Sequence, residues 1–153
     1  MTDDSDESIG MLDELSLGEC MRFLAGNHIG RIAVVVDEYP LVFPVNYRFV
    51  DRAVDGPIIV VRARPGSSVT EADVHVSFQI DGIDAAAGAG WSVLVRGIRH
   101  HVQAVELAEL PFVDPHPWAP GRDEWLVINP IAITGRRLIA GDIGWGFHPL
   151  GYL

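Results

Sequence analysis

The segment Gly30-Arg-Ile-Ala-Val-Val-Val-Asp-Glu-Tyr-Pro-Leu-Val-Phe-Pro-Val-Asn-Tyr47 decides the fold of this chain. It is rich in β-branched and aromatic residues, and a turn signal at 37–40 divides it into two predicted strands at about 29–36 and 41–50. A further strand is predicted at 57–64, between turn signals at 51–56 and at Pro65-Gly66. This spacing of strands and turns is typical of an antiparallel meander or barrel.

The β pattern continues in three more segments, at 74–80, 91–102 and 125–139, and the last is expected to break near Pro130 and at Gly135. The residues between the first two of these, 81–90, are predicted to form a loop. Four prolines make regular structure unlikely in 111–122. The predicted fold class is therefore mainly β, with six or seven strands and two or three short helices.

A short amphipathic helix is predicted before the first strand. Ser16 and Glu19 have the spacing of a capping box. The residues that follow at helical spacing form one apolar face: Leu17, Cys20, Met21 and Leu24. Two other short segments, 69–73 and 104–110, are also expected to be helical.

The predicted domain organisation has three parts. Residues 1–14 form an acidic lead that is expected to be disordered, 15–140 form one barrel domain, and 141–153 form an aromatic tail. We expect the tail to pack on the barrel; the alternatives are that it covers a ligand cleft or contacts a partner chain. No period of 20–50 residues repeats, which excludes solenoids and propellers.

Composition excludes several classes of function. The formal net charge is −10, and six of the 21 acidic residues lie in residues 1–14. An acidic chain with no basic cluster is not expected to bind nucleic acid. The single cysteine fits a reducing compartment, and neither a signal peptide nor an apolar stretch of membrane-spanning length is present. We therefore predict a soluble cytoplasmic protein that does not associate with membranes.

Familiar catalytic motifs are missing. The segment 85–90 is rich in glycine, but a strand follows it, whereas a phosphate loop opens a helix. None of the six histidines has the spacing of a zinc site, so no metal is predicted. There is no nucleophile elbow, and Cys20 lies on the apolar face of the predicted helix. The sequence therefore identifies no catalytic residue.

One combination of residues suits an anion. Arg62 lies on a predicted strand, and Ser67 and Ser68 follow just past the Pro-Gly turn. A guanidinium matches phosphate oxygens, and hydroxyl and turn N–H groups can complete an anion site. The alternative is that all three are solvated surface residues. Because the chain contains no lysine, any phosphate has to be held by arginine, hydroxyl or backbone groups.

Several blocks of sequence, in this order, resemble the pyridoxamine 5′-phosphate oxidase-like flavin-binding split-barrel family, and the resemblance extends from Leu15 to Leu138. The matching blocks are 15–19, 28–34, Phe43-Pro-Val-Asn-Tyr47, Val61-Arg62 before Gly66-Ser67, 76–82, Gly90-Trp-Ser-Val-Leu-Val-Arg-Gly97, Trp118-Ala-Pro-Gly121, 125–130 and 134–138.

The resemblance implies a six-stranded antiparallel split β-barrel that forms a homodimer, with a flavin mononucleotide (FMN) in each of two clefts at the subunit interface. It also implies a set of cofactor-binding residues. The residues expected along the isoalloxazine ring, largely through backbone groups, are Phe43, Pro44, Val45 and Asn46. The residues expected near the phosphate are Arg62, Ala63, Ser67 and Ser68. Trp91 and Ser92 are expected to reach the cofactor from a neighbouring part of the chain, and Arg136 or Arg137 is expected to close the site.

The implied function is that of an FMN-dependent oxidoreductase with an unknown small-molecule substrate. A true pyridoxamine phosphate oxidase is not expected, because the chain shows no added basic set for a second phosphate. The sequence departs from the family pattern at Ser68, where a lysine is usual. Losing one charge-assisted bond weakens phosphate binding by about 1.5–3 kcal/mol, although Arg64 could compensate. Two alternatives therefore stay open: a deazaflavin-dependent reductase, and a non-catalytic split-barrel protein with weakened flavin affinity.

Overall fold

A computed structural model describes residues 11–110 and 112–139 of the chain. Seven strands form one antiparallel sheet in the order β1-β7-β4-β3-β2-β5-β6, and β6 also pairs with β7. The pairing of β6 with β7 closes β2 to β7 into a six-stranded barrel, as predicted. The strands are β1 (Met11–Glu14), β2 (Ile29–Val36), β3 (Tyr39–Arg52), β4 (Gly56–Ala63), β5 (His75–Asp84), β6 (Ala89–Val102) and β7 (Glu124–Ile139).

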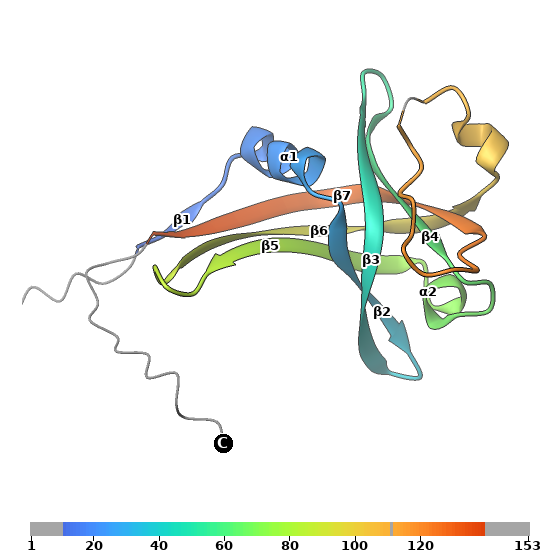
Figure 1. The fold of residues 1–153 in the computed structure, drawn as a ribbon, viewed down its shortest axis with the longest axis horizontal. Helices are drawn as coiled ribbons and strands as arrows, with labels where there is room; N and C mark the ends of the chain where they lie inside the picture. Colours follow the sequence, from blue (N-terminus) through green and yellow to red (C-terminus); the bar gives the residue numbers. More distant parts are fainter. Residues whose placement is uncertain (1–10, 111, 140–153) are drawn as a thin grey trace, which may run out of the picture.

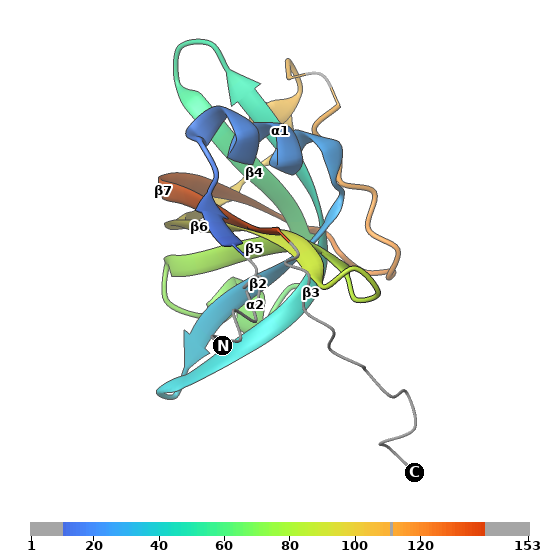
Figure 2. The ribbon, with the colours of Figure 1, turned by 90° about the vertical axis from the view of Figure 1, so that its left-hand side faces the viewer.

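Three short helices accompany the barrel: α1 (Leu17–Gly26), α2 (Ser68–Glu71) and the 3₁₀ helix η1 (Ala104–Leu107). The two views of the ribbon show α1 lying beside β7 at one end of the molecule, while α2 lies at the opposite end (Figures 1 and 2). No helix in the described part of the chain is long and apolar enough to cross a membrane.

The barrel is split between β3 and β4. These strands pair only from Tyr47 and Val61 to their shared hairpin. Beyond that point β3 continues alongside β2, and β4 continues alongside β7. The two strands therefore separate, and beyond this point the edge of β3 that faces β4 and the edge of β4 that faces β3 are not paired with each other.

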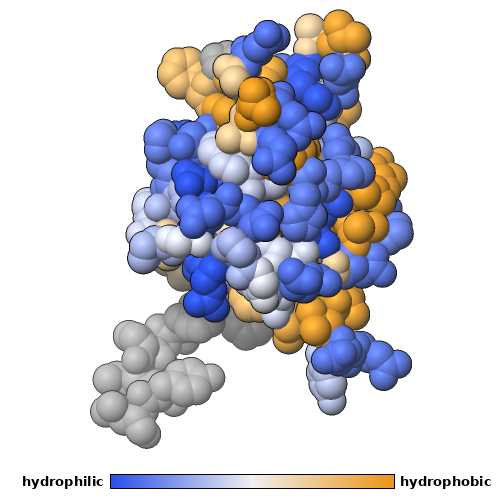
Figure 3. All heavy atoms as spheres, turned by 90° about the vertical axis from the view of Figure 1, so that its right-hand side faces the viewer, coloured by the Kyte–Doolittle hydropathy of each residue, from blue (hydrophilic) through white to orange (hydrophobic). Residues whose placement is uncertain are grey.

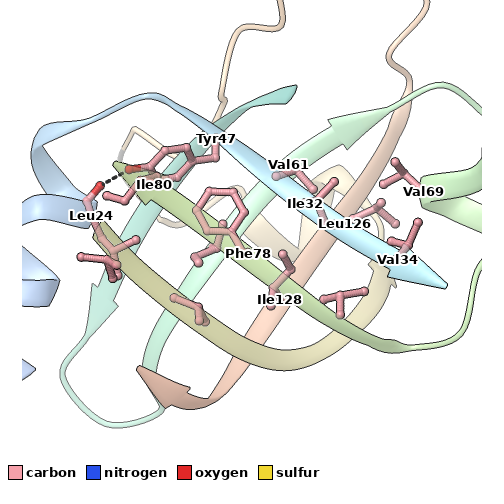
Figure 4. Close-up of a cluster of buried hydrophobic side chains, with 14 of the residues drawn as sticks. Leu24, Ile32, Val34, Tyr47, Val61, Val69, Phe78, Ile80, Leu126 and Ile128 are labelled. Atoms are coloured by element: carbon pink, nitrogen blue, oxygen red, sulfur yellow. Dashed lines mark hydrogen bonds between the residues drawn. The ribbon is translucent and has the colours of Figure 1, made fainter. Parts of the chain in front are cut away.

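The core fills the barrel and extends under α1 (Figure 4). Tyr47 and Phe78 are fully buried and meet edge to face, with ring centroids 4.8 Å apart. The Tyr47 hydroxyl donates a 2.7 Å hydrogen bond to the carbonyl of Leu24, which ties α1 to β3. Burial raises the pKa of this hydroxyl, so it stays protonated and keeps donating.

The predicted helix cap is confirmed. The backbone N–H of Ser16 donates to Glu19 Oε2 at 2.8 Å, and the backbone N–H of Glu19 donates to Ser16 Oγ at 3.2 Å. Cys20 is fully buried on the inner face of α1, and burial raises the pKa of its thiol. A protonated, inaccessible thiol agrees with the absence of thiol chemistry predicted from the sequence.

Four local expectations need correction. Residues 11–14, predicted to belong to the disordered lead, form β1, which pairs with the end of β7. The loop expected at 81–90 is a four-residue turn at 85–88, because β5 and β6 pair as far as Asp84 and Ala89. The helix expected at 104–110 is only the short η1. The parts of the predicted lead and tail at 1–10 and 140–153 lie outside the described residues.

The fourth correction concerns β7, which does not break at Pro130 or Gly135. The register against β6 shifts at Pro130, since Arg96 pairs with Ala132 and Gly97 pairs with Pro130. Ile131 is thus an extra residue in β7. Such a bulge lets a strand carry a proline without ending.

Candidate functional site

The split between β3 and β4 forms a pocket of about 740 Å³. Its walls come from the two strands, from the turn before α2, and from the irregular segment that precedes β7. Eight of the ten cofactor-binding residues predicted from the sequence line it: Phe43, Pro44, Val45, Asn46, Arg62, Ala63, Ser67 and Ser68. The structure therefore brings both predicted subsets to one place, the first on β3 and the second at the end of β4 and in the turn that follows it.

The register of the first hairpin exposes backbone groups of β3 to this pocket. The turn that joins β2 to β3 has two residues, so Val36 and Tyr39 form its first hydrogen-bonded pair. Counting from there, Pro44 and Asn46 direct their backbone groups away from β2. The N–H of Tyr47 confirms this alternation by donating to the carbonyl of His28 at 2.9 Å. Because β3 and β4 pair only as far as Tyr47 and Val61, the carbonyl of Pro44 and the N–H of Asn46 face the split.

A buried hydroxyl without a partner lies in the wall of the pocket. Ser67 precedes α2, and its carbonyl accepts hydrogen bonds from the N–H groups of Thr70 and Glu71, both at 3.0 Å. Its Oγ is buried yet makes no hydrogen bond in the described structure. A buried polar atom left unpaired costs about 1–3 kcal/mol, so the site is one where an acceptor or donor from a ligand would be stabilised.

Among the residues that the structure describes, three arginines and no acidic residue line the pocket, although the chain as a whole is acidic. Arg64 and Arg122 have no carboxylate within ion-pair distance in the described part of the protein. Arg62 is different, because Nη1 lies 3.2 Å from Asp114 Oδ1, Nε donates to the carbonyl of Arg122 at 2.9 Å, and its guanidinium lies over the Trp125 ring at 4.9 Å. The lining is therefore cationic, and Arg62 is held by protein groups.

Asp114 stays ionised beside this arginine. Desolvation raises its pKa, but hydrogen bonds from the backbone N–H of His116 and from the Arg62 side chain outweigh that effect and lower the pKa below its ordinary value. The carbonyl of the same residue accepts a 3.1 Å hydrogen bond from Arg48 Nε. Asp114 thus fixes the 112–123 segment to both β3 and β4.

A buried cation anchors the other end of α2. Arg99 is 4% exposed and donates to the carbonyls of Thr70 and Ala72 at 2.6 and 2.5 Å. These carbonyls come from the C-terminal end of α2, where a positive charge is favourable. Arg99 forms no ion pair with the described carboxylates, and burial lowers its pKa, while the charges of Glu71 and Asp73 act in the opposite direction. Its position on β6 fixes α2, and with it Ser67, against the barrel.

The two remaining predicted residues, Trp91 and Ser92, do not line this pocket. They lie on β6, opposite Arg137 and Arg136 of β7. The Trp91 ring stacks on Phe23 with centroids 4.0 Å apart. Nearby, Arg137 lies 3.7 Å from Glu19. Within one chain this group is a separate cluster at the α1 end of the barrel.

Sequence reasoning missed the contribution of the proline-rich segment. The sequence predicts only irregular structure in 111–122, yet four residues of this segment line the pocket: Pro117, Trp118, Ala119 and Arg122. The block at 118–121 had been matched to the family, but no role was assigned to it. The backbone N–H of Trp118 donates to Asn46 Oδ1 at 3.1 Å, which places the segment over the middle of β3, beside the split. Figure 3 shows that the face carrying α2 and this segment is largely hydrophilic, with hydrophobic groups towards its edges.

A six-stranded antiparallel barrel that opens between two neighbouring strands defines a split-barrel protein. Residues 16–137 match the pyridoxamine 5′-phosphate oxidase family, and the chain belongs to that family.

Individual relatives agree with this assignment. An uncharacterized protein of Mycobacterium tuberculosis is 32% identical over 142 residues, which covers 89% of this chain and 91% of that protein. The structure of an FAD-binding protein from Mycobacterium smegmatis is similar with a TM-score of 0.62 and 29% identity, over 83% of this chain and 98% of that one. A conserved protein of unknown function from Corynebacterium diphtheriae has the same fold, with a TM-score of 0.70 and 22% identity over 84% and 98% of the two chains.

Proposed function

We propose that the protein binds FMN in the pocket between β3 and β4 and acts as a flavin-dependent oxidoreductase. The observation that carries this proposal is the unpaired Ser67 hydroxyl in a pocket that also contains Arg64 and Arg122 without carboxylate partners. An unpaired hydroxyl and free guanidinium groups form a donor set suited to phosphate. The pocket volume of about 740 Å³ lies in the range of cofactor sites.

Different residues would bind the two ends of the cofactor. Ser67, Arg64 and Arg122 would hold the phosphate, while the free edge of β3 at Pro44 and Asn46 would orient the ring through backbone groups. When bound, the flavin supplies the electron-transfer chemistry, and the protein supplies binding, orientation and exclusion of water. This agrees with a site in which the sequence identifies no side-chain acid or base.

The identity of the flavin is the finer part of the proposal. FMN, FAD and a deazaflavin coenzyme share a phosphate-bearing side chain and a tricyclic ring, so the residues described above suit all three. The Mycobacterium smegmatis relative is described as binding FAD, which makes FAD the principal competitor of FMN here. Comparing the three coenzymes in one fluorescence titration would rank them directly.

The second candidate function is a non-catalytic binding protein with weakened flavin affinity. It is favoured by the contact between Arg62 and Asp114, since a phosphate would have to share this guanidinium with a carboxylate at 3.2 Å. The serine at position 68, where the family usually has lysine, would also weaken phosphate binding.

A homodimer is part of the same proposal. Trp91, Ser92 and Arg136 lie together on β6 and β7, away from the pocket of their own chain. A partner subunit could present this cluster to the pocket, and two identical contacts would then close around a two-fold axis. Exposed apolar residues on the outside of β2 and β3, such as Val35 and Val42, would also be covered by association.

The experiment is a titration of the purified protein with FMN, monitored by quenching of flavin fluorescence, for the wild type and for Ser68→Lys. We expect binding at micromolar concentration, and about tenfold tighter binding for Ser68→Lys because a charge-assisted bond is added. No binding of any of the three coenzymes to either protein would refute the proposal. Light scattering on the same samples should give the mass of a dimer, and a clean monomer would refute that part.

A further inference from the structure

A second pocket, of about 610 Å³, adjoins the first and shares three wall residues with it: Ile29, Asn46 and Trp118. It lies where α1 ends and β2 begins, and the segment before β7 forms its far side. A ligand in this pocket would be separated from a ligand in the first pocket only by these three residues. The two pockets are therefore placed to hold two molecules in contact.

The second pocket contains one guanidinium that no carboxylate neutralises. Arg48 is half-buried; its Nε donates to the carbonyl of Asp114 at 3.1 Å, and its Nη1 donates to His28 Nδ1 at 2.8 Å. Both bonds go to neutral acceptors. The positive charge is therefore fixed in direction but uncompensated among the described residues. The same Nη1 lies 3.4 Å from His28 Nε2, so the imidazole ring lies directly against the guanidinium.

The other charges of the pocket largely cancel. Arg31 Nη1 lies 3.4 Å from Asp81 Oδ1 and 3.2 Å from the Gln79 amide oxygen. Asp81 is thus matched by Arg31, and the net charge contributed by the arginines and the carboxylate is that of Arg48 alone. One fixed guanidinium suits a single carboxylate. The first pocket, which has three arginines, is the better match for a phosphate.

The residues shared by the two pockets indicate that the rest of the ligand is apolar. Trp118 is 80% exposed and Ile29 is 47% exposed, and both face the region between the two pockets. The hydrogen bond from the Trp118 N–H to Asn46 fixes this wall relative to β3. A molecule whose carboxylate binds Arg48 would therefore lay an apolar or aromatic body over Ile29 and Trp118, pointing towards the first pocket.

We propose that the second pocket binds the carboxylate of the substrate, a small molecule with an apolar, planar body that reaches the flavin across Ile29 and Trp118. The word substrate rests on the proposed function, whereas the binding of such a carboxylate to the pocket does not. The two can be tested separately, because carboxylate binding can be measured on protein without flavin.

The test uses benzoate as the probe and benzamide as its uncharged match, with binding measured by calorimetry on protein without flavin. We expect benzoate to bind at millimolar concentration and benzamide to bind about tenfold more weakly or not at all, as expected for loss of one charge-assisted bond. Arg48→Gln should abolish this preference. The matched control is Arg52→Gln on the same strand, whose guanidinium donates to the carbonyls of Asp55 and Gly56 and lines neither pocket.

Arg48→Gln could loosen the 112–123 segment, so Arg48→Lys is included as a charge-preserving variant that should retain most of the preference for benzoate. The thermal unfolding midpoint of each variant is measured in parallel. Equal affinity for benzoate and benzamide, or loss of the preference in Arg52→Gln to the same extent, would overturn the proposal. It would also be overturned if FAD displaced benzoate while FMN did not, since the pocket would then hold the outer half of the dinucleotide. Flavin that fails to bind while benzoate binds through Arg48 would refute the proposed cofactor and leave this site standing.

Discussion

The Asp114 carboxylate lies 3.2 Å from Arg62 Nη1, so the arginine predicted to bind a phosphate is paired with a residue of the protein itself. The pair is partly buried, with side-chain exposures of 23% for Arg62 and 35% for Asp114. A phosphate entering the pocket would compete with this carboxylate for the same donors. The contact should therefore lower the affinity of the proposed site for phosphate.

Asp114→Asn should strengthen flavin binding by about tenfold, because the neutral amide leaves Arg62 free to bind phosphate. The amide oxygen can still accept the hydrogen bond from the His116 N–H, which keeps the local turn. Fluorescence titration with FMN measures the change. Asp73→Asn is the control, since Asp73 binds His75 at the surface and does not line the pocket. Unchanged affinity in Asp114→Asn would show that Arg62 takes no part in holding the phosphate.

The same pair should stabilise the fold in a pH-dependent way. The pKa of Asp114 in the folded protein lies below its ordinary value of 3.8, so its contribution is present above that value and is lost as the pH falls through the lower, folded pKa. The free energy of unfolding of the wild type should therefore exceed that of Asp114→Asn at neutral pH. The difference should shrink below about pH 4. Denaturant titrations of both proteins at several pH values test this, and a difference that grows with acidity would contradict the assignment.

Ser67→Ala should affect stability and binding in opposite directions. The hydroxyl is buried without a partner, so its removal should leave the free energy of unfolding of the flavin-free protein unchanged or raise it by up to about 1 kcal/mol. Flavin affinity should fall by about tenfold, since a donor to the phosphate is lost. Ser77→Ala on β5, outside the pocket, should change neither quantity by a comparable amount. Loss of stability together with unchanged affinity would mean that Ser67 has only a structural role.

Much of the barrel could be predicted from the sequence because its strands alternate or carry continuous β-branched runs. Residues 91–102 illustrate this, since Val93, Val95 and Gly97 are buried while Leu94 and Arg96 are exposed, as the period of two requires. The strand at Met11–Glu14 was missed because its pairing partner is the end of β7, more than a hundred residues away. The local sequence of this acidic segment contains no pattern that predicts pairing with such a distant strand.

The candidate site was predicted in part for the same reason. Residues on β3, at the end of β4 and in the turn after β4 could be placed together through the family resemblance, and the split between the strands brings them into one pocket. The pairing of Arg62 with Asp114 could not be read from the sequence, because it depends on how a proline-rich segment folds back across 52 residues. The unpaired state of the Ser67 hydroxyl is likewise visible only once every neighbour is in place.

Gly30→Ala should destabilise the protein because the strand that borders the pocket has no room for a side chain there. A Cβ at Gly30 would collide with the Phe78 ring, its Cε2 atom lying 2.8 Å away and its Cζ atom closer still. Phe78 is fully buried against Tyr47, so it cannot move aside without disturbing the core. Overpacking of this kind typically costs about 1–3 kcal/mol. Gly18→Ala in α1 is the matched control, because nothing lies within 4 Å of its Cβ position and alanine favours the helix by about 0.5–1 kcal/mol. The denaturant midpoint of Gly30→Ala should therefore be lower than that of the wild type, and the midpoint of Gly18→Ala should be higher. A wild-type midpoint for Gly30→Ala would show that the Phe78 ring does not exclude a side chain at position 30.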